Sequence, residues 1–242
     1  MVGFWPKFWK TSKAVGFWVL WVVTCYFLVQ LLISILVGLL AGQIPKGDVL
    51  FSVLGNITMY ILMLALAVGL PLLIKKQLHL GKVTEILALT RRPRWGDLGK
   101  AVLIVIYYFS ILFTAMFLLM CFFPDIYSQE QELGFSTTGN SVPQLVLVFF
   151  SLVIVAPVAE ELIMRGLLFG KLRQNLPFWP AAIIVSALFA LAHGQINVGV
   201  DTFILSLFLC WSREKTGAIY TPILIHMLKN LLGFVTIFGI LA

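Results

Sequence analysis

Residues 143–168 read PQLVLVFFSLVIVAPVAEELIMRGLL, an apolar run that contains only three charged side chains. A membrane-spanning helix needs about 20 predominantly apolar residues, and this run is long enough. Ionisable groups inside such a helix are costly and mark a functional site by default. Glu160, Glu161 and Arg165 therefore indicate a transmembrane helix that carries functional side chains.

The rest of the chain has the same character. Its 242 residues are 61% hydrophobic and 11% charged, whereas soluble domains carry about 25% charged residues. This composition excludes a soluble enzyme, a disordered chain and a nucleic-acid-binding module, despite a net charge of +7. We predict an all-α, polytopic transmembrane helical bundle of seven spans, or eight if the last one breaks near Gly233. The expected spans are 14–41, 50–74, 101–123, 143–168, 181–197, 199–211 and 218–241.

Basic residues orient the bundle, because Lys and Arg concentrate in cytoplasmic connections. Fourteen of the 17 fall in four segments: three in 7–13, seven in 75–100, two in 171–173 and two in 213–215. Their alternation predicts a cytoplasmic N-terminus and a multi-pass protein of the cell membrane. The chain is compact, which favours a bacterial protein. We expect one integral membrane domain over residues 1–242, and a short amphipathic helix on the inner membrane surface within 77–99.

The expected partners follow from this location. The lipid bilayer is one, a protein or peptide substrate is another, and nucleic acid is not expected. The sequence defines no oligomeric state. The cysteines Cys25, Cys121 and Cys210 all lie in apolar runs, so no disulfide framework is predicted.

The acidic pair in the fourth run divides between two helix faces. Glu161 and Arg165 are four residues apart, in the order that favours an ion pair on a helix. Glu160 projects about 100° away and is free to approach another helix. An ion pair alone explains two of the three charged residues, so the third requires a different role.

Two histidines lie in later apolar runs, each paired with a residue one helical turn away. They are His193, four residues after Phe189, and His226, four residues before Asn230. With a rise of 1.5 Å per residue, Glu160, His193 and His226 lie roughly 12–18 Å from the cytoplasmic side. We therefore expect these three side chains to converge.

Two polar residues near these clusters receive structural roles. Asp201 precedes an apolar run and is predicted to be a helix N-cap at the outer interface. Lys229 is predicted to point away from the site or to extend its ammonium group to the interface.

A glutamate, two imidazoles and an amide form a hydrolytic set, and two mechanisms suit it. In the first, Glu160, His193 and His226 bind a Zn²⁺ ion that activates water. In the second, no metal is needed: Glu160, paired with His193, is the general base, while His226 and Asn230 form an oxyanion hole. The sequence leaves both open.

The three motifs together resemble a known family. Glu160-Glu161-x-x-x-Arg165, Phe189-x-x-x-His193 and His226-x-x-x-Asn230 are similar, in this order, to the motifs of the CAAX protease and bacteriocin-processing (CPBP, or Abi) family. These membrane-embedded endopeptidases are related to the prenyl-protein endoprotease Rce1. The resemblance covers residues 143–235 and implies a catalytic core there.

The resemblance also implies a role for each motif residue. Glu160 would be the catalytic glutamate, and His193 would help to activate water. His226 and Asn230 would stabilise the oxyanion or, for the histidine, bind a metal, as the family's description as metalloproteases suggests. Glu161 and Arg165 would support them.

The expected function is thus an integral membrane endopeptidase that hydrolyses a peptide bond in a membrane-associated protein or peptide, with a role in bacteriocin processing or self-immunity. The alternative is a non-catalytic membrane protein that confers immunity by binding. A small proton-coupled transporter is a third interpretation, and the absence of inverted sequence repeats counts against it.

Overall fold

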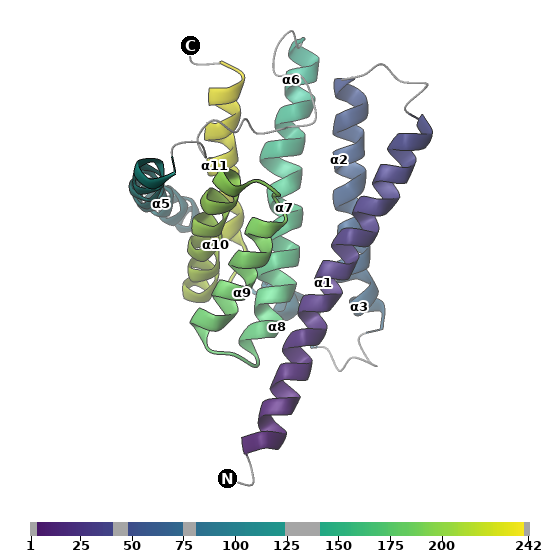
Figure 1. The fold of residues 1–242 in the computed structure, drawn as a ribbon, viewed down its shortest axis with the longest axis vertical. Coiled ribbons are helices and arrows are strands. Elements are labelled where there is room, and N and C mark those ends of the chain that lie inside the picture. The colour runs from purple at the N-terminus through teal and green to yellow at the C-terminus, as the bar shows by residue number, and fades with distance from the viewer. Residues whose placement is uncertain (1–3, 41–47, 75–80, 124–140, 240–242) are drawn as a thin grey trace.

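The computed structural model describes residues 4–40, 48–74, 81–123 and 141–239, and throughout these ranges the regular secondary structure is helical (Figure 1). The first half contains α1 (Phe4–Leu40), α2 (Val49–Met63), the π-helical segment η1 (Leu64–Gly69), α3 (Leu70–Leu73), α4 (Val83–Ile86) and α5 (Trp95–Phe122). The second half contains α6 (Val142–Phe149), η3 (Phe150–Val155), α7 (Ala156–Glu161), η4 (Leu162–Leu168), α8 (Phe169–Arg173), α9 (Phe178–Leu191), α10 (Ile196–Thr216) and α11 (Tyr220–Ile237).

Within the residues that the structure describes, six helical stretches are long and apolar enough to cross a membrane, and α9 is a shorter apolar helix. The six are Thr11–Leu40, Val49–Leu73, Trp95–Phe122, Val142–Arg173, Ile196–Thr216 and Tyr220–Ile237. In Figure 1, α1 begins at the lower end of the bundle and α11 ends at the upper end. The chain is therefore a multi-pass membrane protein, and the predicted helical bundle is confirmed.

The boundaries around α9 and α10 differ from the prediction. α9 has 14 residues and ends at Leu191 rather than at residue 197, so it is only about 21 Å long. α10 begins at Ile196 and continues to Thr216. The sequence at 191–201 mixes apolar residues with His, Gly, Gln, Asn and Asp, so the apolar pattern alone misplaced the break. The short α9 ends at Leu191, and His193 lies just beyond its end.

Proline shapes the contact between the first two spans. Pro71 has no N–H to give to a carbonyl of the preceding turn, and the turns before it are π-helical, with the Leu70 N–H bonded to the Ala65 carbonyl. In the same segment, the Trp21 indole N–H of α1 donates to the Ala67 carbonyl at 3.1 Å. A side chain of one helix thus hydrogen-bonds the backbone of the other.

The basic connection folds into the bundle and does not form the predicted surface helix. Its helix α4 is a single turn, and Ile86 at its end and Leu87 and Ala88 beyond it are buried. A Cβ atom at Gly166 would lie 3.2 Å from the Leu87 Cα atom, so glycine permits this close approach. The Ile219 N–H also donates to the Ala88 carbonyl at 3.0 Å. The part of the prediction at 77–80 lies outside the described residues.

Candidate active site

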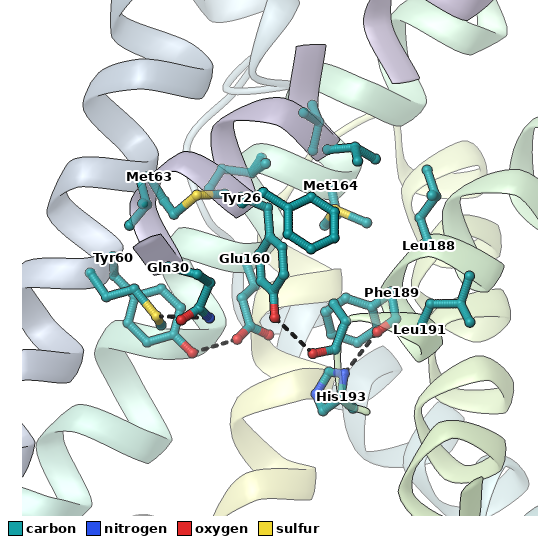
Figure 2. Close-up of a pocket in the computed structure, with 17 residues that line it drawn as sticks. Tyr26, Gln30, Tyr60, Met63, Glu160, Met164, Leu188, Phe189, Leu191 and His193 are labelled. Atoms are coloured by element: carbon teal, nitrogen blue, oxygen red, sulfur yellow. Dashed lines mark hydrogen bonds between the residues drawn. The ribbon is translucent and has the colours of Figure 1, made fainter. Parts of the chain in front are cut away.

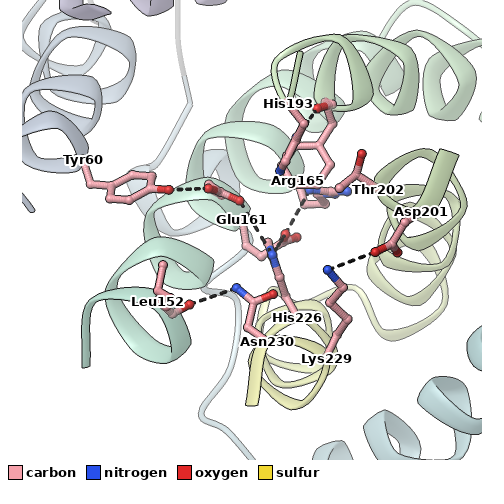
Figure 3. A network of polar contacts seen from close by, with 12 residues as sticks. Tyr60, Leu152, Glu161, Arg165, His193, Asp201, Thr202, His226, Lys229 and Asn230 are labelled. Carbon is pink, nitrogen blue, oxygen red and sulfur yellow. Dashed lines mark hydrogen bonds and ion pairs between the residues drawn. The ribbon is translucent and has the colours of Figure 1, made fainter. Parts of the chain in front are cut away.

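The motif residues of α7, the end of α9 and α11 lie together (Figure 3). His226 is central: its Nδ1 atom is 2.9 Å from Glu161 Oε1, and its Nε2 atom is 3.7 Å from Glu160 Oε2. His193 lines the same cavity as Glu160. The structure therefore brings together the three side chains that the depth estimate led us to expect near one another.

Glu161 is held inside the protein. Its side chain is fully buried, and Oε1 accepts from Arg165 Nη1 and from His226 Nδ1, both at 2.9 Å. The guanidinium carbon of Arg165 lies 4.6 Å from the centre of the Phe189 ring, in a cation–π contact. A buried arginine needs a negative partner, because an unpaired charge in this environment is strongly unfavourable. The predicted Glu161–Arg165 pair is confirmed.

The contacts of His226 fix the position of one ring proton. A carboxylate only accepts hydrogen bonds, so Glu161 requires a proton on His226 Nδ1. The Nε2 atom then faces Glu160. At 3.7 Å the two groups are too far apart for a direct hydrogen bond, and this spacing suits a water molecule that contacts both.

His193 is fixed by the end of its own helix. Its Nδ1 atom lies 2.7 Å from the Phe189 carbonyl oxygen, one of the last carbonyls of α9, which have no partner within the helix. The contact requires the proton on Nδ1 and leaves Nε2 as an acceptor in a neutral ring. The Phe189 ring also contacts both histidines edge-on, with centroid distances of 4.9 Å to His193 and 5.8 Å to His226. Phe189 thus organises both imidazoles.

Glu160 faces a cavity of about 410 Å³ between α1, α2, α9 and the α7–η4 region (Figure 2). Its side chain is 21% exposed, whereas that of Glu161 is 0% exposed. The cavity walls are mostly aliphatic, aromatic and thioether side chains; their polar members are Tyr26, Gln30, Tyr60, Glu160 and His193. Figure 2 places Glu160 and His193 at the same end of this cavity.

One wall of the cavity supplies a further contact to Glu160. The Tyr60 hydroxyl of α2 donates to Glu160 Oε1 at 2.6 Å. Tyr60 was not among the predicted site residues, since it lies 100 positions away and no motif includes it. Its phenol in an otherwise apolar run was the only sequence signal.

Asn230 is tied to the catalytic helix through its backbone. In η3 the Ala156 N–H bonds to the Ser151 carbonyl, five residues back, and the next donor in that register would be residue 157. Pro157 has no N–H, so the Leu152 carbonyl is left without a helical partner. The Asn230 amide group donates to it at 2.9 Å, which holds α11 against the segment that leads to Glu160. An amide has two N–H groups, so the second remains for another acceptor.

One structural role that the sequence suggested is wrong. Asp201 lies within the second turn of α10 and does not cap it. Its carboxylate accepts from the Tyr108 hydroxyl and pairs with Lys229 Nζ at 3.1 Å. Lys229 does not line the cavity of Glu160 and His193, in line with the expectation that it points away from the site. The pair joins α10 to α11 outside the cavity.

The predicted zinc ligands Glu160, His193 and His226 lie near one another, but their described positions do not form a metal site. Among the residues that the structure describes, no group of three or more His, Cys, Asp or Glu side chains could hold a metal ion. The His193 Nδ1 and His226 Nδ1 atoms both contact protein oxygens, which leaves the Nε2 atoms as the ones that a metal would use. The zinc-dependent mechanism stays a prediction for experiment.

The second half of the chain matches a known family. Residues 142–232 match the model described as type II CAAX prenyl endopeptidase Rce1-like. This range contains every motif residue discussed above.

Two curated bacterial proteins are similar to the chain. The membrane-embedded CAAX protease MroQ of Staphylococcus aureus (strain USA300) is 26% identical over 236 residues, which cover 92% of this chain and 90% of that protein. An uncharacterized 24.3 kDa protein of Escherichia coli is 30% identical over 99 residues, or 39% of this chain. That match spans only 46% of the E. coli protein. No solved structure matches the chain.

Proposed function

We propose that the chain is an integral membrane endopeptidase, because residues 142–232 match the model described as type II CAAX prenyl endopeptidase Rce1-like. It hydrolyses a peptide bond in a membrane-associated protein or peptide, with the catalytic core at 143–235 of a single membrane domain. One observation carries the proposal: Glu160 lines an open apolar cavity, while the adjacent Glu161 is buried and its Oε1 atom contacts Arg165 and His226.

Glu160 is the general base in this mechanism. A water molecule between Glu160 Oε2 and the histidines loses a proton to the carboxylate, and its oxygen attacks the carbonyl carbon of the scissile bond. The neutral His193, with Nε2 as an acceptor, orients the same water. After the C–N bond breaks, the proton on Glu160 passes to the leaving nitrogen, so that the products are a carboxylic acid and an amine.

His226 and Asn230 stabilise the oxyanion in this proposal. A His226 ring with a proton on each nitrogen donates to Glu161 through Nδ1 and to the developing oxyanion through Nε2. The charges of Glu160, Glu161, Arg165 and His226 then sum to zero, which a low-dielectric site favours. The second N–H of Asn230 is the other donor. Preorganised donors of this kind are each worth about 10²–10³ in rate.

The cavity suggests the substrate class. Its walls are mainly apolar, and Phe27 and Leu191 on it are strongly exposed. A peptide segment that partitions into a membrane can therefore enter it with little loss of apolar contact. Processing of a bacteriocin-type peptide, or self-immunity against one, is the role that we propose for such an activity.

A non-catalytic immunity protein is the second candidate, since the same cavity could bind a membrane-active peptide without cutting it. The experiment that separates the two uses purified protein in proteoliposomes and a library of peptides with one apolar segment, with products read by mass spectrometry. The variants are His193→Ala and, as a control, Tyr107→Phe, whose residue is exposed on α5.

The endopeptidase predicts discrete cleavage products with the wild type and with Tyr107→Phe, and none with His193→Ala. Peptides that bind the wild type but stay intact would contradict it and favour the immunity protein. A chelator arm addresses zinc: loss of cleavage that added Zn²⁺ restores would support a metal mechanism, and unchanged cleavage supports the metal-free one.

A further inference from the structure

We propose that Tyr60, on α2 and outside the family domain, is a positioning residue for the Glu160 carboxylate. This inference rests on the proposed function and extends the active site to the first half of the chain. Tyr60 contacts neither of the histidines through any described hydrogen bond, so its effect on the reaction acts through Glu160.

The hydrogen bond is the first argument. A phenol that donates to an ionised carboxylate at 2.6 Å forms a short, charge-assisted bond, about twice as strong as a neutral one. The bond engages Oε1 and leaves Oε2 directed at His226 Nε2. One oxygen is thus anchored while the other is presented to the position of the water.

The scarcity of other contacts is the second argument. Among the hydrogen bonds and ion pairs of the described residues, Glu160 takes part in one short bond to Tyr60 and a longer approach to His226. Its neighbours in the cavity wall include Met59, Met63 and Ile163, which cannot donate a hydrogen bond. The terminal torsion of a glutamate is soft. Without the phenol the carboxylate can therefore rotate away from the water.

The placement of α2 is the third argument. The Trp21 indole bonds to the Ala67 carbonyl of η1, two turns beyond Tyr60, and so fixes the height of α2 relative to α1. α2 also packs against α6, η3 and α7. Tyr60 therefore approaches Glu160 from a helix that is anchored on both sides.

A matched pair of tyrosines makes the inference testable. Tyr60→Phe and Tyr108→Phe each remove one phenol-to-carboxylate hydrogen bond between helices. Only Tyr60 lines the cavity, whereas the Tyr108 partner, Asp201, lies outside it. Both variants would be purified and assayed in proteoliposomes on a peptide that the wild type cleaves, together with His193→Ala.

We expect Tyr60→Phe to lower kcat about 10- to 100-fold with KM changed less than about 3-fold, because misplacement of a reacting group by about 1 Å costs up to 10²-fold. Tyr108→Phe should stay within about 2-fold of the wild-type kcat. An unchanged kcat in Tyr60→Phe, or a loss confined to KM, would overturn the inference. Cleavage by His193→Ala at the wild-type rate would instead contradict the proposed function itself.

A second substitution covers the case in which Tyr60→Phe is poorly folded. Replacing Tyr60 with 4-aminophenylalanine keeps the ring and restores an N–H donor near the Glu160 carboxylate. Recovery of at least about 10-fold in kcat over Tyr60→Phe supports the positioning role. Failure of this variant to recover kcat, with normal membrane insertion, overturns it.

Discussion

Glu160 and Glu161 are neighbours in the chain, yet they face two different regions of the molecule. Glu161 points into the packed interior between α7 and α11, where Arg165 and His226 hold it and no water reaches it. Glu160 points into the cavity, where it has one short bond to Tyr60 and a looser approach to His226. A carboxylate that must exchange protons needs access and spare acceptor positions, and only Glu160 has both. We infer from this difference that Glu161 stabilises the folded protein and that Glu160 takes part in the reaction.

The largest expected effect tests the packed side. Glu161→Gln leaves Arg165 as a buried charge without an ionic partner, so we expect a loss of about 3–5 kcal/mol in the free energy of unfolding. The midpoint of thermal unfolding in detergent measures this. Since replacing both partners by apolar groups relieves the unpaired charge, Glu161→Leu with Arg165→Met should be more stable than Glu161→Gln. A Glu161→Gln variant as stable as the wild type would contradict the structural role of this residue.

The next largest effect is expected at Phe189, whose ring lies between the two regions. Phe189→Leu removes the cation–π contact with Arg165 and the edge contacts with both histidines. We expect about 1–2 kcal/mol of destabilisation. We also expect a cleavage rate about tenfold lower, because both imidazoles lose their contact with the Phe189 ring. Phe149→Leu is the control, since it breaks an aromatic pair with Phe234 that belongs to a different apolar cluster from Phe189. Equal cleavage rates in the two variants would show that Phe189 only fills space.

A smaller effect on stability is expected where the connection that contains α4 packs against η4. In Gly166→Ala the new methyl group would lie 3.2–3.3 Å from Leu87 backbone atoms, so we expect about 1–2 kcal/mol of destabilisation. Gly55→Ala, with open space around its Cβ position in α2, should be neutral or slightly stabilising. Thermal unfolding of the two variants tests the predicted difference; the opposite order would mean that the connection does not pack on η4.

The smallest effect is expected at the polar cluster that lies outside both regions. The Lys229–Asp201 pair is about one-quarter exposed, so Lys229→Met should change the free energy of unfolding by less than about 1 kcal/mol. Cleavage should remain within about 2-fold of the wild type. A large loss of cleavage with normal stability would contradict this and would mean that Lys229 belongs to the active site.

The sequence predicts those parts of the site that depend on helical periodicity. The Glu161–Arg165 pair follows from four-residue spacing, and the shared depth of Glu160, His193 and His226 follows from the rise per residue. The helical bundle follows from the apolar runs. These features are local or nearly so, and the structure agrees with them.

Contacts between distant segments could not be predicted in this way. Tyr60 approaches Glu160 across 100 residues because α2 packs against α7, and no local pattern encodes that packing. Aspartate often caps helices, but α10 begins five residues before Asp201, so this side chain does not cap the helix. It accepts a hydrogen bond from Tyr108 of α5 instead. Pro157 was visible in the sequence; its consequence, a free Leu152 carbonyl for Asn230, required the neighbouring helix.

The most direct test of the division between the two carboxylates is the cleavage rate of Glu160→Gln in proteoliposomes, normalised to folded protein. Glutamine has nearly the same shape and keeps an acceptor for Tyr60, but it cannot take a proton from water. We predict a rate at least about 10³-fold below that of the wild type, as expected for the loss of a general base, with an unchanged midpoint of thermal unfolding. Cleavage within tenfold of the wild-type rate would contradict the assignment of Glu160 as the reacting carboxylate.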